Sequence, residues 1–418
     1  MQFNKNDHYL VAVDIGTSFV KVVVANNIQN SDNKNLYIAS VGKIESRGVR
    51  KGVVINIDST QEAINKALLQ AEELLGDRIE TAYLAIGGDH LKGLNSTGVV
   101  KIKYNEVTEE DILNVVESAR AIPLPEDREI LHLVPQEYIV DGQRAFKKPL
   151  GIGGVRLEIS VHIIAGISNT IQNFIKCLNR CNVNVKDIVV NSIASSFGVT
   201  TLEEREQGVC VIDIGAGTCD LNIFYGGALH HSYTLALGGS NITNDLASGL
   251  RTTILSAEKL KCQQGCATTK VLKSDSRIEI PQIGTNHSKI ITLSEMTNII
   301  EKRMTEIFSL LNNQVDTDLK TLLTGGVVLT GGGANLKGIE TLAENVFSMP
   351  ARKGVPNGVS GLSDFVTSPE FSTAVGMLKY LNSNADEAFY SNFNGQFYSG
   401  NFFNRGFVKV KNWISEHF

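Results

Sequence analysis

The sequence lacks any apolar run long enough to cross a membrane as a helix. No stretch reaches the roughly 18 consecutive apolar residues that such a helix needs, and residues 1–8 contain no apolar core for a signal peptide. An excess of basic residues is also missing, because the formal net charge is -5 at pH 7. Without a global positive field the chain is not expected to bind nucleic acid. These absences predict a protein that stays in the cytosol.

The cysteines lack the spacing of a metal finger. Two pairs, Cys177 with Cys181 and Cys262 with Cys266, are spaced so that a helix would bring both sulfurs to one face. A zinc site is one interpretation, but neither pair is accompanied by a second Cys or His pair at finger spacing. Small buried thiols of a reducing compartment are the favoured interpretation.

What is present is an ordinary globular composition on a long chain. Hydrophobic residues make up 42% and charged residues 20%, a balance that excludes a disordered or fibrous protein. A chain of 418 residues is too long for one ordinary domain. We therefore expect several domains, with a cleft between lobes.

Two glycine-containing hairpins repeat in the sequence about two hundred residues apart, which indicates an internal duplication. In the first, apolar strands at 9–13 and 19–25 flank the sequence DIGTS at 14–18. In the second, strands within 208–224 flank DIGAGT at 213–218. A third glycine turn follows a strand at 326–330 and opens a helix expected at 336–347.

The two hairpin tips suit the binding of phosphates. Phosphates need backbone N–H groups that approach closely, and glycine allows both the approach and the tight turn. One side of a polyphosphate would be held by Gly16, Thr17 and Ser18, and the other by Gly215, Ala216, Gly217 and Thr218. A single hairpin of this kind is often a plain surface turn. Its repetition favours a phosphate site.

Charged side chains near the tips would complete this site. Lys21 is placed to return its ammonium to the phosphates. Asp14 and Asp213 end the two first strands, where their carboxylates can hold magnesium through its waters.

The third turn is expected to hold the base of a nucleotide. Its residues Gly331, Gly332, Gly333 and Ala334 offer a flat floor for a purine. Glu258 and Lys261 lie one turn apart on an expected helix, from which both could reach the ribose or base. That spacing alone is also typical of a solvated ion pair.

The last fourteen residues, 405–418, are expected to form an amphipathic helix that binds an anionic membrane surface. Its apolar side carries Phe407, Val410, Ile414 and Phe418, with Trp413 at the border, and its basic residues are Arg405, Lys409 and Lys411. The alternative is a helix docked on its own protein. The polar segment 382–404, which reads as a flexible tether, favours the membrane, because docking would not need it.

Several motifs, together with the glycine loops, carry a resemblance to a known family. They are Ser46-Arg47-Gly48, LVPQEY at 133–138, PLGIGGVR at 149–156 and YGGAL at 225–229. With these motifs the chain resembles the actin, Hsp70 and sugar-kinase superfamily, and within it the FtsA family of bacterial cell-division proteins. The resemblance runs over nearly the whole chain.

The resemblance implies an α/β, two-lobed actin-like ATPase fold with duplicated core domains and an FtsA-type inserted subdomain. The first lobe core would comprise 1–88, 162–190 and 351–381, interrupted by the inserted subdomain at 89–161. The second lobe core would comprise 191–240 and 313–350, with its own subdomain at 241–312. The tether at 382–404 and the membrane helix at 405–418 would follow.

The resemblance also implies a function. ATP with magnesium would lie between the lobes, contacted by the residues named above, and hydrolysis would be weak or absent because no residue can be assigned as a water-activating base. The protein would anchor filaments of FtsZ to the cytoplasmic face of the inner membrane at the division septum, assemble with itself, and help to recruit later division proteins.

The resemblance further implies that the FtsZ tail docks on the second-lobe subdomain. The helix expected at 294–311 is the candidate surface, and Arg303 could pair with the acidic tail. The alternative for Arg303 is an ordinary helical ion pair. Two other functions stay open for the whole chain: a small-molecule kinase and a pilus-assembly ATP-binding protein of the same superfamily.

Overall fold

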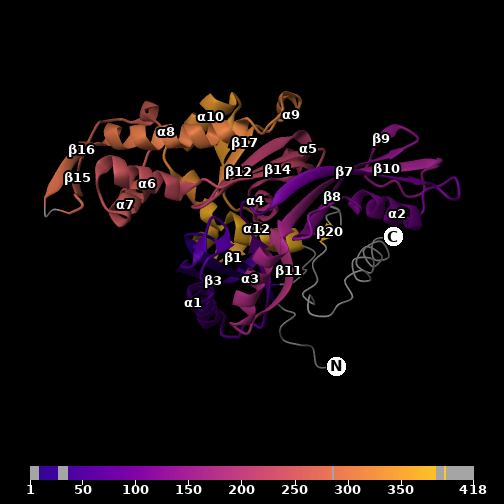
Figure 1. Ribbon diagram of the computed structural model, residues 1–418, viewed down its shortest axis with the longest axis horizontal. Coiled ribbons are helices and arrows are strands. Elements are labelled where there is room, and N and C mark those ends of the chain that lie inside the picture. Colours follow the sequence, from indigo (N-terminus) through magenta and orange to yellow (C-terminus); the bar gives the residue numbers. More distant parts are fainter. Residues whose placement is uncertain (1–8, 27–35, 285–286, 383–389, 392–418) are drawn as a thin grey trace.

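The computed structural model describes residues 9–26, 36–284, 287–382 and 390–391. These residues form three large sheets with helices packed against them (Figure 1). None of the helices in these ranges is long and apolar enough to cross a membrane. The expected membrane helix at 405–418 lies outside the described residues, as does most of the tether expected at 382–404.

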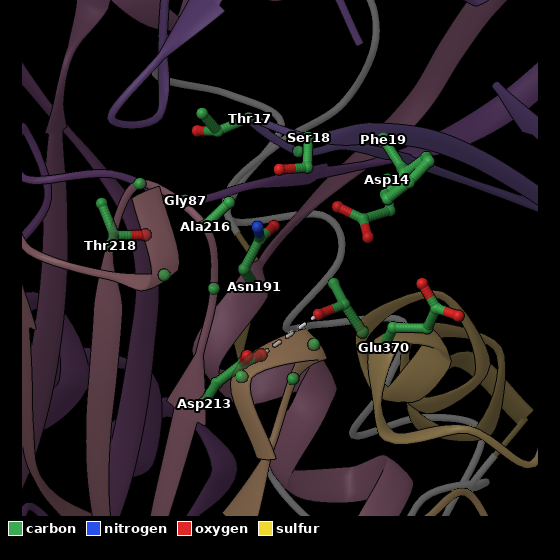
Figure 2. A pocket seen from close by; sticks show the side chains of 18 of the residues that line it. Asp14, Thr17, Ser18, Phe19, Gly87, Asn191, Asp213, Ala216, Thr218 and Glu370 are labelled. Carbon is green, nitrogen blue, oxygen red and sulfur yellow. Dashed lines mark hydrogen bonds between the residues drawn. The ribbon is translucent and has the colours of Figure 1, made fainter. Parts of the chain in front are cut away.

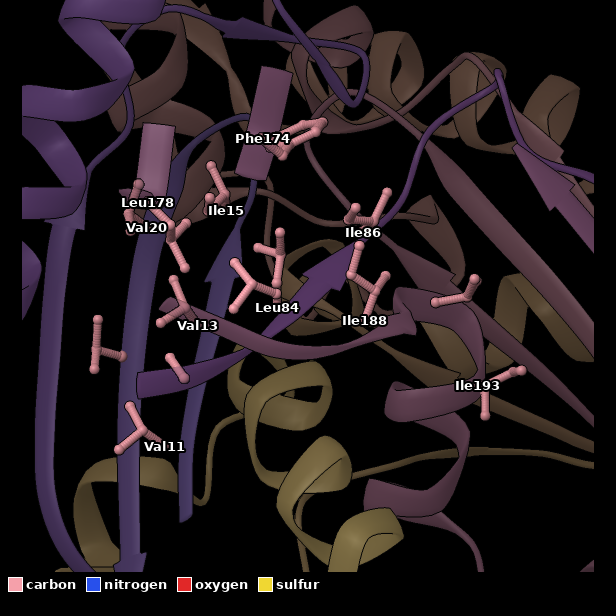
Figure 3. Packing of buried hydrophobic residues seen from close by; sticks show 14 of the residues in the cluster. Val11, Val13, Ile15, Val20, Leu84, Ile86, Phe174, Leu178, Ile188 and Ile193 are labelled. Carbon is pink, nitrogen blue, oxygen red and sulfur yellow. The ribbon is translucent and has the colours of Figure 1, made fainter. Parts of the chain in front are cut away.

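The first lobe is built on a six-stranded sheet in the order β11-β6-β1-β2-β3-β19. The strands are β1 (Tyr9–Ile15), β2 (Phe19–Asn26), β3 (Leu36–Glu45), β6 (Thr81–Ile86), β11 (Asn184–Val190) and β19 (Val359–Gly361). Its strands are nearly continuous apolar runs because helices cover both faces. The helices α1 (Ile57–Leu75) and α3 (Ser168–Asn179) bury one face, and Figure 3 shows Phe174 and Leu178 of α3 packed over that face. The helices α4 (Asn191–Val199) and α12 (Ser372–Asn382) cover the other.

The second lobe repeats this topology, with a five-stranded sheet in the order β14-β13-β12-β17-β18. The strands are β12 (Val209–Ile214), β13 (Cys219–Tyr225), β14 (Ala228–Leu235), β17 (Val327–Thr330) and β18 (Ala351–Lys353). Strand β12 pairs antiparallel with β13 and parallel with β17, as β1 does with β2 and β6. The matching order supports the duplication that the sequence predicts.

The outer part of the second lobe is mainly helical and lies at the left of Figure 1. Its elements are α6 (Gly239–Leu250), α7 (Ile254–Gln264), α8 (Leu293–Asn312) and the hairpin of β15 (Arg277–Pro281) and β16 (Ser288–Thr292). Met296, Ile300 and Phe308 of α8 are fully buried in the second-lobe core. This packing fixes α6 and α7 beside the cleft.

The inserted subdomain forms a third sheet, β20-β8-β10-β7, with β9 paired to β8. Its strands are β7 (Lys92–Lys101), β8 (Arg128–Val140), β9 (Gln143–Phe146), β10 (Arg156–Ile167) and β20 (Tyr390–Ser391), and α2 (Glu109–Arg120) covers one face. Strand β10 continues past residue 161 to Ile167. Beyond residue 161 the strand contributes to two cores, because Ile163 lies in the core of the subdomain whereas Ile164 lies in the core of the first lobe.

Most local elements agree with the sequence prediction, and one differs. Both hairpins and the helix ending before Gly76 are confirmed, and Gly76 closes that helix at φ 72. The helix expected at 336–347 is wrong at its start. A short 3-10 helix, η3 (Gly332–Asn335), comes first, and α10 (Ile339–Phe347) begins only after Gly338, whose φ is 72. A positive φ interrupts a right-handed helix, so the two segments stay separate.

Candidate functional site

A cavity of about 430 Å³ lies where the two hairpin tips, the Gly331 loop and helices α6 and α7 meet (Figure 2). Thirteen of the fourteen residues expected to contact the nucleotide line it, together with both carboxylates expected to hold magnesium. They are Asp14, Gly16, Thr17, Ser18, Lys21, Asp213, Gly215, Ala216, Gly217, Thr218, Glu258, Lys261, Gly331, Gly332 and Gly333. Segments more than three hundred residues apart in sequence thus share one cavity.

The two hairpin tips have the same turn. The Gly16 N–H donates to Phe19 O at 3.0 Å, and the Gly215 N–H donates to Thr218 O at 2.9 Å. A Cβ added at Gly16 or Gly215 would lie 3.0 or 2.9 Å from the same acceptor oxygen, so both turns need glycine. The second tip is also fixed by the start of α6, where Gly239 N–H donates to Gly215 O at 2.9 Å.

The tips meet across the cavity. A Cβ added at Gly217 would lie 2.6 Å from Thr17 Oγ1 of the opposite lobe and 3.0 Å from Lys51. No side chain at position 217 fits this approach. The two lobes therefore present their turn backbones to one small space, which is the geometry that a polyphosphate bound between them needs.

Lys21, which is expected to return its ammonium to the phosphates, lines the cavity and is paired there with Asp14. Its Nζ lies 2.9 Å from Asp14 Oδ2, and both side chains are buried. Burial would lower the pKa of Lys21, but the Asp14 carboxylate outweighs burial and the pKa of Lys21 is raised. Lys21 is therefore a fixed positive charge in the cavity wall, held by Asp14.

Two buried carboxyls lie on the second-lobe side of the cavity. Burial raises the pKa of Asp213 to about 6, with Asp14 adding to the rise while hydrogen bonds from Ser195 and Thr373 oppose it. Asp220, which the sequence prediction missed, lines the same cavity, and burial together with Asp213 raises its pKa to about 7. Carboxyls held this far from water favour a nearby cation, which fits the expected magnesium.

The Gly331 loop closes the base of the cavity. Gly331 has a φ of 79, and a Cβ there would lie 2.2 Å from Asp213 Oδ1. A Cβ at Gly332, by contrast, would meet no atom within 4 Å. Ala334 is the exception among the expected contacts, because its side chain is fully buried in the second-lobe core and is not part of the cavity wall. The turn of η3 points it inward.

Glu258 and Lys261 form one hydrogen-bonded group with Thr243 of α6. Lys261 Nζ donates to Glu258 Oε2 at 2.7 Å, to Thr243 Oγ1 at 2.8 Å and to Gly239 O at 3.0 Å. Thr243 Oγ1 also bonds Glu258 Oε2. Burial would raise the pKa of Glu258, but Lys261 outweighs it and the pKa is lowered. The pair of Glu258 and Lys261 is therefore tied to α6 at the cavity wall, through Thr243 and Gly239.

The cavity wall also includes residues that the sequence prediction missed, among them Asn191, Lys43 and Glu370. Asn191 begins α4, and Figure 2 shows its side chain in the same space as Asp14 and Asp213. Lys43 Nζ lies 2.7 Å from Glu370 Oε2 and 4.3 Å from the centre of the Phe19 ring. Position 370 is far along the chain from position 43, so only the tertiary fold brings them together. The apolar strand β11 ends directly before Asn191, and this position is the sequence feature that could have predicted Asn191.

Arg303 lies outside the cavity wall, and its guanidinium is paired with two carboxylates. Arg303 on α8 is held by Asp245, with Nε–Oδ2 at 2.5 Å and Nη2–Oδ1 at 3.0 Å, and by Glu306 at 2.5 Å. The ion-pair alternative for Arg303 is thus present.

Within the described ranges, no group of three or more His, Cys, Asp or Glu side chains is arranged to hold a metal. Cys177 and Cys181 instead bond backbone carbonyls of α1, and burial raises the pKa of each to about 11.

Models of known protein families match two parts of this chain. The family model for cell division protein FtsA matches residues 210–376, and the model for the SHS2 domain inserted in FtsA matches residues 88–165. Cell division protein FtsA of Pseudomonas aeruginosa is 37% identical over 98% of this chain and 98% of its own length. The FtsA proteins of Neisseria meningitidis and Escherichia coli are 40% and 35% identical, over 90% and 89% of this chain and 90% of their own lengths.

Comparisons with solved structures show the same fold. The PilM–PilN type IV pilus biogenesis complex includes a chain that superposes with a TM-score of 0.66 at 17% identity, covering 89% of this chain and 98% of that one. MreB5 of Spiroplasma citri bound to ADP superposes with a TM-score of 0.57 at 12% identity, covering 92% of this chain and 100% of that one. From its sequence relatives and this fold, the chain belongs to the FtsA family of cell-division proteins, with the α/β actin-like fold and the inserted subdomain of that family.

Proposed function

We propose that this cell-division protein binds ATP with magnesium in the cavity between its lobes. The observation that carries the proposal is the pair of matching turns at Gly16 and Gly215, which face each other closely enough to bring Thr17 against Gly217. The turns supply backbone donors for phosphates, and Gly331, Gly332 and Gly333 supply a floor for the base. MreB5 of Spiroplasma citri, a protein of the same fold, is bound to ADP, an adenine nucleotide, in its solved structure.

The residues present fit a magnesium ion carried by the nucleotide. Asp14 and Asp213 are buried carboxylates at the ends of β1 and β12, and magnesium usually keeps several of its waters and takes few protein ligands. When bound, the ion would neutralise phosphate charge. Asp14 keeps Lys21 in place, Asp213 offers a second carboxylate, and the cavity wall limits access of bulk water.

ATP serves here as a structural ligand and conformational switch, with weak or absent hydrolysis. The described wall of the cavity contains several carboxyls and two amides, Asn191 and Asn335, but nothing places one of them on a water beside a bound phosphate. Calorimetry with magnesium and ATP tests the binding. A protein that releases no binding heat and gains no thermal stability with the nucleotide would refute the proposal.

We further propose that the protein anchors FtsZ filaments to the cytoplasmic face of the inner membrane at the division septum. Family membership supports this role, and residues 405–418 supply an amphipathic sequence suited to an anionic lipid surface. The protein assembles with itself and helps to recruit later division proteins, for which the inserted subdomain offers a separate surface. MamK, which forms a double helical filament, shares this superfamily fold at a TM-score of 0.50.

The docking site for the FtsZ tail remains the surface of α8 that includes Arg303. Because Asp245 and Glu306 already hold this guanidinium, an acidic tail would bind by taking the place of one of them. Carboxylates of a peptide can form the same bidentate contact that Asp245 makes. The Arg303 guanidinium can therefore bind the tail only when one of these two carboxylates gives up its contact.

A further inference from the structure

Strand β14 contacts the cavity and the inserted subdomain at once. Near its end, Thr234 Oγ1 donates to Asp220 Oδ1 at 2.5 Å, and Asp220 lines the cavity. Two residues earlier, Ser232 Oγ lies 2.7 Å from His162 Nε2 on β10 of the subdomain. Side chains two positions apart on a strand lie on one face. The two hydrogen bonds therefore belong to a single continuous face of β14.

The subdomain rests on this strand through each of its longer strands. From β8, Gln136 Nε2 donates to Leu229 O at 3.1 Å. From β7, Gly93 packs so closely that a Cβ there would lie 2.2 Å from Ser232 Oγ. Within the subdomain, Asn95 Oδ1 of β7 lies 2.7 Å from Nδ1 of His162, the residue that contacts Ser232. Such close contacts leave little room for β14 to move without moving the subdomain.

The other end of this connection can sense what occupies the cavity. Asp220 is only 6% exposed and lies directly opposite Thr234 in the pairing of β13 with β14. Asp220 also lies directly opposite Asp213 in the pairing of β12 with β13, and both residues line the cavity. A cation or phosphate beside Asp213 therefore changes the potential that Asp220, and with it the Thr234 hydroxyl, experiences.

We propose that β14 couples nucleotide binding to the inserted subdomain, with Thr234 as a positioning residue at the cavity and Ser232 as its contact with the subdomain. The inference rests on the proposed nucleotide binding and names how that site is regulated. Coupling between binding sites is reciprocal. A partner that shifts the subdomain must therefore change nucleotide affinity, although Ser232 and His162 do not line the cavity.

Hydrogen exchange of the full chain, with and without magnesium and ATP, tests the coupling. In the parent protein, ATP should change exchange in segments covering α2 and β8, which lie outside the cavity. Thr234→Val removes the hydroxyl at nearly constant shape, and Ser232→Ala removes the contact with His162. Both should abolish that ATP-dependent change, whereas Thr234→Ser should restore it. Thr97→Val, on the exposed face of β7, is the matched control and should behave as the parent.

Calorimetry on the same proteins separates the two proposals. If the parent binds no ATP, the proposed function fails. If the parent binds ATP but exchange in α2 and β8 does not respond, or if Thr234→Val responds as fully as the parent, the coupling is overturned. If the coupling free energy has its usual size, Ser232→Ala should change the affinity for ATP by about fivefold or more. The effects of Ser232→Ala and Thr234→Val should not add, because both interrupt one connection.

Discussion

Thr17 and Gly217, on hairpin tips of opposite lobes, lie so close that a Cβ added at Gly217 would be 2.6 Å from Thr17 Oγ1. The two halves of the duplicated fold therefore meet at their turns. Because residues of both turns line the cavity, a ligand between them would contact both lobes at once. A ligand that binds better when the lobes are closed would shift the protein toward the closed arrangement.

Gly332 gives a clean test of the floor expected to hold the base. A Cβ at Gly332 meets no atom within 4 Å, so Gly332→Leu should fold normally and fill the cavity with its side chain. We expect calorimetry to show loss of ATP binding with an unchanged melting temperature, and Gly332→Ala to lose much less. Gly331→Leu is a poorer probe, because its φ of 79 and the nearby Asp213 carboxylate would make it destabilise the fold. Full ATP affinity in Gly332→Leu would show that the base does not lie on this floor.

The pKa of Asp213 predicts how stability depends on pH. Its folded-state pKa is about 6, above the ordinary 3.8. Such a carboxyl binds its proton more tightly when folded, so it favours folding at low pH and that contribution is lost as pH rises through about 6. Asp213→Asn should therefore stabilise the nucleotide-free protein by about 1–3 kcal/mol at pH 8 and by little at pH 4.

Chemical denaturation at the two pH values checks this expectation, with the exposed Asp318→Asn as control. The same Asp213→Asn protein should bind magnesium and ATP more weakly. A gain in stability that is equal at both pH values would contradict the assignment of a buried, raised-pKa carboxyl.

The buried pair of Lys21 and Asp14 predicts a large loss of stability when one partner is removed. Lys21→Met leaves the Asp14 carboxylate buried without a counter-charge, which typically costs about 3–5 kcal/mol. Lys66→Met breaks an exposed pair with Glu62 and should cost about 1 kcal/mol or less. Urea denaturation measures both. If the double variant Lys21→Met with Asp14→Leu is no more stable than Lys21→Met alone, the loss does not come from the stranded charge.

Arg303 can be tested by freeing it as well as by removing it. If the acidic FtsZ tail binds this guanidinium, Asp245→Asn should strengthen binding because it weakens the competing bidentate contact. Arg303→Ala should weaken binding by about tenfold, as expected for a lost charge-assisted hydrogen bond, while the neighbouring exposed Lys302→Ala should change it little. Fluorescence anisotropy with a labelled tail peptide measures all of these. Equal affinities for Asp245→Asn and Arg303→Ala would remove Arg303 from the docking site.

The sequence predicted the backbone of this site better than its side chains. The turns at Gly16 and Gly215 were predictable because a tight turn leaves a local glycine signal next to an apolar strand. The pairing of Lys21 with Asp14 was not, since it depends on the register of β1 with β2, which places the two residues opposite each other. Asn191 and Glu370 were missed because each reaches the cavity only through the packing of distant elements. Asp220 was missed although it lies on the second hairpin itself, opposite Asp213, as Lys21 lies opposite Asp14 on the first.

Ala334 shows the opposite error. It follows three glycines that face the cavity, and so it was assigned with them. The 3-10 turn of η3 instead directs its methyl group into the second-lobe core. Local sequence indicated where the loop lies, but only the turn geometry decides which side each residue faces.

The most direct test of the central claim, an ATP-binding adaptor between FtsZ and the membrane, is co-sedimentation with anionic liposomes in the presence of magnesium and ATP, with and without FtsZ. The parent protein should sediment with the liposomes and carry FtsZ with it. Trp413→Glu, which places a charge at the border of the apolar face of 405–418, should stay in the supernatant while binding ATP normally, and Trp413→Phe should behave as the parent. If Trp413→Glu sediments as well as the parent does, at matched protein and salt concentrations, this segment is not the anchor and the adaptor account is contradicted.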